Sequence, residues 1–111
     1  MFKKNIICKI ILLYFFITLS FSFSAKSQTS VSIQTAEQAL SNGNYEKALD
    51  IWQILSNRGN LIAINNLGFM YERGYGVTRN QKKAVALYKK AAEGGIAVAQ
   101  FNYGEALFLG N

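Results

Sequence analysis

The chain repeats itself with a period of 36 residues, and this period limits the possible folds more than any other feature. Glycine matches glycine, alanine matches alanine, and an aromatic residue matches an aromatic residue, without an insertion. The matched pairs are Lys47 and Lys83, Ala48 and Ala84, Trp52 and Tyr88, Gly59 and Gly95, Ala63 and Ala99, Asn66 and Asn102, Gly68 and Gly104, and Gly74 and Gly110. A constant period of this length is typical of arrays in which each unit buries its apolar face only against its neighbours. The sequence therefore predicts stacked copies of one small unit.

Each unit is predicted to be a pair of helices. Apolar residues recur at helical spacing in the segments 35–40, 45–57, 61–73, 81–93 and 96–109. Glycine-containing turns separate these segments, residues 74–79 form a longer loop, and Asn80 is placed to cap the fourth helix. The chain has no proline and no alternating strand pattern. The predicted fold class is all-α: a short right-handed α-solenoid of about two and a half stacked helical hairpins over residues 35–111, with units near 35–59, 60–95 and an incomplete 96–111.

The first 27 residues have the three parts of a secretory signal peptide. A basic n-region (1–9) with three lysines precedes an apolar h-region (10–23), and small residues follow it. Cleavage is expected after Ser24 or after Ser27, and residues 28–34 then form a polar spacer. The alternative is an uncleaved membrane anchor, which ordinarily needs about 18 or more apolar residues. We therefore expect an exported protein, periplasmic or secreted, that contacts the membrane only transiently through this segment.

Removal of this segment also removes most of the net positive charge, which falls from +6 to +2. The chain has 12 basic and 6 acidic residues, and four of the basic ones (Lys3, Lys4, Lys9 and Lys26) precede residue 28. The remaining eight basic and six acidic residues give a net charge of +2. Nucleic-acid binding calls for a clustered basic face, so no nucleic-acid partner is expected. The lysines between residues 82 and 90 are interpreted as a solvated helix face.

The residues that remain after cleavage offer little for catalysis. The chain has no histidine, and its one cysteine, Cys8, lies in the signal segment. Zinc sites built from Cys and His, and triads with a histidine base, are thereby excluded. The six carboxylates show no paired spacing, and Gly74-Tyr75-Gly76 lacks the Lys-Ser/Thr of a phosphate loop. We expect no cofactor, no metal and no enzymatic activity.

Two glycines indicate where helices come close together. Gly68 and Gly104 lie in the middle of predicted helices, where glycine costs about 0.5–1 kcal/mol relative to alanine. A position that accepts this cost twice, one period apart, predicts a close approach of the neighbouring helix at both residues. The aromatic residues Trp52, Tyr71, Tyr88 and Tyr103 are interpreted as core residues that fill the space between helices.

The pattern resembles the Sel1-like repeat, a relative of the tetratricopeptide repeat. The residues that carry the resemblance are the run Ala63-Ile64-Asn65-Asn66-Leu67-Gly68-Phe69-Met70-Tyr71, the loop Gly74-Tyr75-Gly76-Val77, the pair Lys83-Ala84, and the ending Tyr88-Lys89-Lys90-Ala91-Ala92-Glu93-Gly94-Gly95. The first unit departs from this pattern, since Asn42 to Ala48 is more similar to an ordinary tetratricopeptide turn. The resemblance implies a non-catalytic adaptor whose curved surface holds a protein or peptide partner.

In such stacking, the first helix of each hairpin lines the concave face. The resemblance then implies a contact surface at the non-core positions Ile62, Asn65, Phe69 and Glu72, and one period later Val98, Phe101, Glu105 and Phe108. The alternative is that Phe69, Phe101 and Phe108 only pack between units.

The last predicted helix leaves apolar residues such as Phe101, Leu107, Phe108 and Leu109 without a following helix to cover them. Solenoids need a polar terminal cap for solubility. We expect the chain to be a fragment of a longer array; the alternative is that this open end binds another chain or self-associates. Two other functions stay open: the first part of a longer envelope-associated enzyme, and a membrane-anchored assembly factor with an uncleaved N-terminal segment.

Overall fold

The computed structural model describes Lys9 and residues 30–110. Except for Lys9, the predicted signal segment (1–27) lies outside the described residues, as do its two candidate cleavage sites. Residues from Val31 onward form one compact unit. The regular secondary structure of this unit is helical, and the part of the chain that the structure describes contains no strand.

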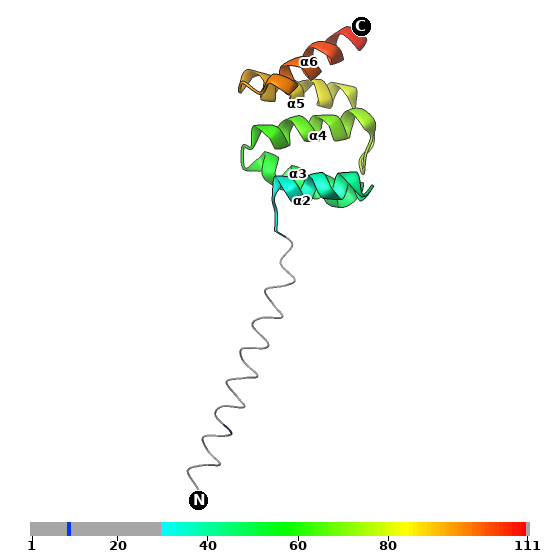
Figure 1. The fold of residues 1–111 in the computed structure, drawn as a ribbon. Coiled ribbons are helices and arrows are strands. Elements are labelled where there is room, and N and C mark those ends of the chain that lie inside the picture. Colours follow the sequence, from blue (N-terminus) through cyan, green and yellow to red (C-terminus); the bar gives the residue numbers. More distant parts are fainter. Residues whose placement is uncertain (1–8, 10–29, 111) are drawn as a thin grey trace, which may run out of the picture. The chain divides into compact units, whose positions relative to one another are not determined.

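Five helices follow one another with short connections: α2 (Ile33–Ser41), α3 (Tyr45–Asn57), α4 (Leu61–Arg73), α5 (Gln81–Glu93) and α6 (Ala97–Leu109). Each helix packs against the next one along the chain (Figure 1). The prediction of an all-α helical repeat array is confirmed. The bounds of α3, α4 and α5 are those that the spacing of apolar residues predicts.

The first and last helices begin elsewhere than predicted. Helix α2 begins at Ile33 rather than Thr35, so the predicted polar spacer (28–34) overlaps its first two residues. The cause is a capping box: the Ser32 side chain accepts from the Thr35 N–H, and the Thr35 hydroxyl oxygen accepts from the Ser32 N–H. Helix α6 begins at Ala97, because Ile96 is its N-cap and has extended backbone angles.

Asparagine side chains fix the starts of the three middle helices. Asn44, Asn60 and Asn80 each accept a hydrogen bond from the N–H three residues later, at 3.3, 3.0 and 3.0 Å. The predicted cap at Asn80 is thereby confirmed. Gly59, which follows α3, has a φ of +82°, a conformation that glycine adopts without strain.

Small residues and large aromatic residues alternate in the core. Trp52 is fully buried with Leu67 and Met70 between α3 and α4. Tyr88 of α5 is buried with Ala84 and with Ala106 of α6. Aromatic rings therefore fill the spaces that the neighbouring alanines leave, as the sequence predicts for Trp52 and Tyr88. Tyr71 and Tyr103 are partly buried and pack against the same cluster as Tyr88.

The predicted close approach exists at Gly68 and is wrong for Gly104. A Cβ atom placed on Gly68 would lie 2.9 Å from Cδ1 and Cε1 of Tyr88 and 3.3 Å from the Ala84 carbonyl oxygen. A Cβ atom on Gly104 would meet nothing within 4 Å. The reason is that Gly68 faces α5, whereas Gly104 faces away from the helices of the described part of the chain.

We expect Gly68→Ala to lower the free energy of unfolding by about 1–3 kcal/mol, because the new methyl group overpacks a buried interface. Gly104→Ala is the matched control, because Gly104 occupies the equivalent position of the next repeat. It should raise the free energy of unfolding by roughly 0.5–1 kcal/mol, since alanine is favoured over glycine in a helix interior. Urea unfolding of residues 28–111 in dilute solution, followed by circular dichroism, measures both. Equal losses from the two substitutions would contradict this account.

Candidate functional site

Helical geometry separates the predicted contact residues into two groups that face different directions. On α4, Ile62, Phe69 and Arg73 are spaced i, i+7 and i+11 and therefore share one face. One period later, Val98, Glu105 and Leu109 occupy the corresponding face of α6. We call these six residues the α4–α6 surface. It contains Ile62, Phe69, Val98 and Glu105 of the predicted set, together with Arg73 and Leu109, which the sequence analysis did not select.

Three apolar residues of this surface are exposed: Ile62, Val98 and Leu109. The side chains of Ile62 and Val98 are 44% and 55% exposed and occupy equivalent positions in successive units, and Leu109 at the end of α6 is 72% exposed. A partner that lies across α4 and α6 would therefore meet an aliphatic side chain on each helix.

Asn65 is not part of the accessible surface, which corrects the prediction for this residue. It is only 5% exposed, and its Oδ1 accepts a hydrogen bond from Nδ2 of Asn102 at 3.0 Å. Its own Nδ2 donates to Oδ1 of Asn66 at 3.3 Å. Asn65 therefore connects α4 to α6, and a partner cannot reach it without opening the array.

Glu72 is held by Tyr88. The Tyr88 hydroxyl donates to Oε2 of Glu72 at 2.9 Å, between α5 and α4. Burial, and then this hydrogen bond to a carboxylate, raise the pKa of the Tyr88 phenol well above its ordinary value. The hydroxyl therefore stays protonated and acts as a donor. Glu72 is half-buried and has one carboxylate oxygen committed to the fold.

A cleft with charged walls lies at the C-terminal ends of α4 and α6. Its lining residues are Glu72, Arg73, Arg79, Glu105 and Leu109. The Arg73 guanidinium lies over the ring of Phe69, with Cζ 5.6 Å from the ring centroid. Among the described residues neither Arg73 nor Arg79 forms an ion pair. Both guanidinium groups are therefore available to an anionic group that enters the cleft.

Phe69 is fixed in place by the loop between α4 and α5. The ring of Tyr75 meets Phe69 edge-on at 5.7 Å and stacks on Tyr45 of α3 at 4.2 Å. Gly76 lies so close to Tyr45 that a Cβ atom would come within 2.9 Å of the Tyr45 carbonyl oxygen. The loop, which the sequence analysis treated only as a turn, therefore packs against the start of α3. Helical periodicity could not predict the stack of Tyr75 on Tyr45, because Tyr75 lies in a loop.

Phe101 and Phe108 face away from the α4–α6 surface. Their equivalents on α4 are Asn65 and Glu72, which face the helices that follow α4. The alternative prediction required these phenylalanines to pack between two units. Both are exposed instead, and among the described residues neither lies between two units. They belong to a separate face of α6.

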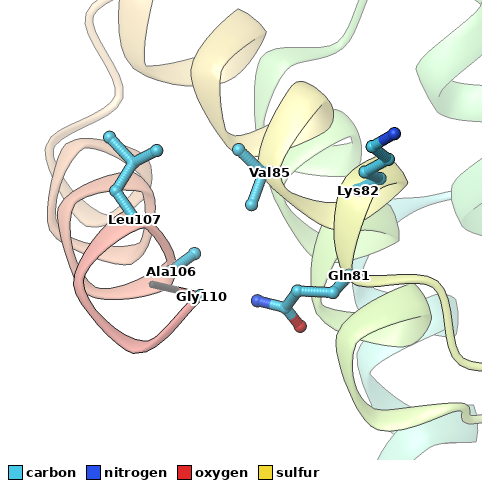
Figure 2. A pocket seen from close by; sticks show the side chains of 6 residues that line it. All are labelled: Gln81, Lys82, Val85, Ala106, Leu107 and Gly110. Atoms are coloured by element: carbon cyan, nitrogen blue, oxygen red, sulfur yellow. The ribbon is translucent and has the colours of Figure 1, made fainter.

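A second groove opens between the first turn of α5 and the last turn of α6. Figure 2 shows Val85 and Leu107 facing each other across it, with the Gln81 amide near Ala106 and Gly110. The lining is mainly aliphatic, and no predicted contact residue contributes to it.

In residues 9 and 30–110, no group of three or more His, Cys, Asp or Glu side chains lies close enough to hold a metal ion. None of the helices in this part of the chain is both long and apolar enough to cross a membrane.

Comparison with known proteins identifies the repeat. The Sel1 repeat family matches residues 61–96, which include α4 and α5, and again residues 97–111, which include α6. No curated protein and no solved structure matches the chain. Sel1 repeats are generally protein–protein interaction modules and are typically non-catalytic.

The hydrogen bond between Asn102 and Asn65 should be measurable as a coupling between α4 and α6. Asn102→Ala leaves the buried Oδ1 of Asn65 without its donor, so we expect a loss of about 1–3 kcal/mol in the free energy of unfolding. Glu105→Ala, an exposed change on the same helix, should stay within about 0.5 kcal/mol of the unmodified chain. Adding Asn65→Ala completes a double-mutant cycle. Strictly additive losses would show that the two amides do not interact.

Proposed function

Since this chain is a Sel1-like repeat protein, we propose that it is a non-catalytic interaction module that binds a polypeptide on the α4–α6 surface. Two observations support the proposal together. Exposed aliphatic side chains stand on both helices, at Ile62 and Val98. The same surface leads into a cleft in which Arg73 and Arg79 have no ion-pair partner among the described residues.

These features define the chemistry of the partner. Apolar side chains of a bound segment would cover Ile62 and Val98, and burial of such aliphatic groups is the main favourable term in association. An aspartate, a glutamate or a terminal carboxylate of the partner would pair with Arg73 or Arg79. Guanidinium groups suit this role because they bind carboxylates through two parallel hydrogen bonds. Glu72 and Glu105 at the cleft walls would disfavour a partner with several acidic groups side by side.

We also propose that the protein is exported to the periplasm or secreted. The support is the sequence of residues 1–27, with its basic start, short apolar run and small-residue exit. An adaptor in that location would act on extracytoplasmic polypeptides.

Peptide selection on residues 28–111 tests the binding surface. A phage-displayed library of random peptides should yield binders that combine apolar residues with an acidic residue. Ile62→Glu and Val98→Glu should each weaken their binding at least tenfold, about 1.4 kcal/mol. Ile54→Glu is the matched control, because Ile54 is similarly exposed (39%) but lies on α3. Arg73→Ala combined with Arg79→Ala should remove the preference for the acidic residue. Binders that are insensitive to all four changes would contradict the proposed surface.

Export is tested by expression of residues 1–111 in bacterial cells, followed by fractionation and N-terminal sequencing. We expect a protein outside the membrane fraction whose new N-terminus is Ala25 or Gln28. An intact Met1 in the membrane fraction would instead support an uncleaved anchor.

A further inference from the structure

Two asparagine side chains lie in the middle of the α4–α6 surface. On α4, Asn66 follows Ile62 by four residues and precedes Phe69 by three, so the three residues share one face. Asn102 is the equivalent residue of α6, 36 residues later. Both asparagines are half-buried. The surface therefore carries an amide group at the same position of two successive repeats.

A chain of hydrogen bonds connects these two amides through Asn65. Nδ2 of Asn102 donates to Oδ1 of Asn65 at 3.0 Å, and Nδ2 of Asn65 donates to Oδ1 of Asn66 at 3.3 Å. Asn65 itself is only 5% exposed, so the connecting amide lies beneath the surface. The three amides thus form one chain of donors and acceptors that runs from α6 to α4 in a fixed direction.

This direction decides which atom each outer amide offers to a partner. A side-chain amide has a carbonyl oxygen that accepts and an NH₂ group that donates. Asn66 uses its oxygen within the chain, and its Nδ2 has no hydrogen-bond partner among the described residues. Asn102 uses its nitrogen, and its Oδ1 has no partner in the same part of the protein. Neither of the two atoms is among the buried polar atoms that lack a partner, so both reach the surface.

A donor on α4 and an acceptor on α6 are complementary to a polypeptide backbone. Every residue of a partner other than proline carries one carbonyl oxygen and one N–H. In a helix these groups are already paired with each other, whereas an extended segment leaves them available for a binding protein. The two asparagines therefore favour a partner that is extended where it crosses the surface.

The flanking residues would then read the side chains of the partner. In an extended segment, successive side chains point to opposite sides. Those that point toward the protein meet Ile62 and Val98, which are exposed on either side of the amides. The asparagines hold the backbone whatever its sequence, and the aliphatic contacts select apolar side chains.

We propose that Asn66 and Asn102 bind the backbone of an extended polypeptide segment on the α4–α6 surface. Nδ2 of Asn66 donates to a backbone carbonyl of the partner, and Oδ1 of Asn102 accepts from a backbone N–H. The proposal rests on the proposed function, since it names the conformation of the partner at the same surface. The buried amide of Asn65 determines that α4 donates and α6 accepts.

An N-methyl scan of the tightest peptide from the phage selection on residues 28–111 tests the acceptor. Methylation of one backbone nitrogen at a time removes one N–H, and we expect one or two positions to weaken binding roughly tenfold in isothermal titration calorimetry. With Asn102→Ala the unmodified peptide should already bind less tightly. Methylation at the sensitive position should then have no further effect, as in a double-mutant cycle.

Asn66→Asp tests the donor. Aspartate keeps an oxygen that accepts from Asn65 and replaces the outward Nδ2 by a second oxygen. Binding should weaken roughly tenfold, while circular dichroism should show an unchanged helix content because Asn and Asp have similar helix propensities. The peptide for this measurement has its acidic residue changed to the corresponding amide, so that repulsion between carboxylates does not contribute. Gln53→Ala, which removes an exposed amide of α3, is the control and should leave the affinity unchanged.

Three results would overturn the proposal. Losses at most methylated positions would indicate a helical peptide that depends on its own hydrogen bonds. No sensitive position, or an unchanged affinity of Asn66→Asp, would show that the asparagines do not hold the backbone. If Ile62→Glu still weakens binding in either case, the proposed surface stands and only the extended conformation fails. A selection that yields no peptide sensitive to Ile62→Glu removes the surface and the backbone contacts together.

Discussion

The α4–α5–α6 part of the array depends on the contact between Gly68 and the ring of Tyr88. Because Gly68 has no side chain, the ring occupies space in which a Cβ atom would lie 2.9 Å from two of its carbons. The ring then reaches Ala84 on its own helix and Ala106 on α6, so it joins three helices in one buried cluster. Its hydroxyl meets Glu72 at the edge of the charged cleft. One missing side chain therefore sets the spacing of the helices and orients a carboxylate at the candidate site.

The same helix presents different faces to different neighbours, and this determines which residues a partner can reach. On α4, Ile62 and Arg73 are exposed, Phe69 is partly buried against the cluster of Ala84, Tyr88 and Ala106, and Asn65 and Glu72 are engaged by the helices that follow. Apolar spacing alone does not distinguish these cases. Only the identity of their neighbours separates the accessible residues from those that connect units.

The sequence predicts the helices well and the site only in part, for physical reasons. Apolar spacing and asparagine caps are local, so the bounds of α3, α4 and α5 follow from them. The start of α2 depends on hydroxyl groups of Ser32 and Thr35, which apolar spacing does not register. Asn65 was assigned to the surface as a non-core position on the first helix of a hairpin, yet its partner Asn102 lies 37 residues away and only the fold brings them together.

At equivalent positions, α4 and α6 carry the same residue type where they pack against similar neighbours and different types elsewhere. Positions that face the preceding helix, such as Ala63 and Ala99, must be small in both, because both helices pack on the helix before them. The polar residues of α4 that engage the helices after it, Asn65 and Glu72, are both replaced by phenylalanine in α6. Glycine is kept at position 104 although it lowers helix stability there, and a Cβ atom at this position would meet nothing within 4 Å. Gly68 accepts the Tyr88 ring in one unit, and Gly104 leaves the same room for a ring at the matching position of the next.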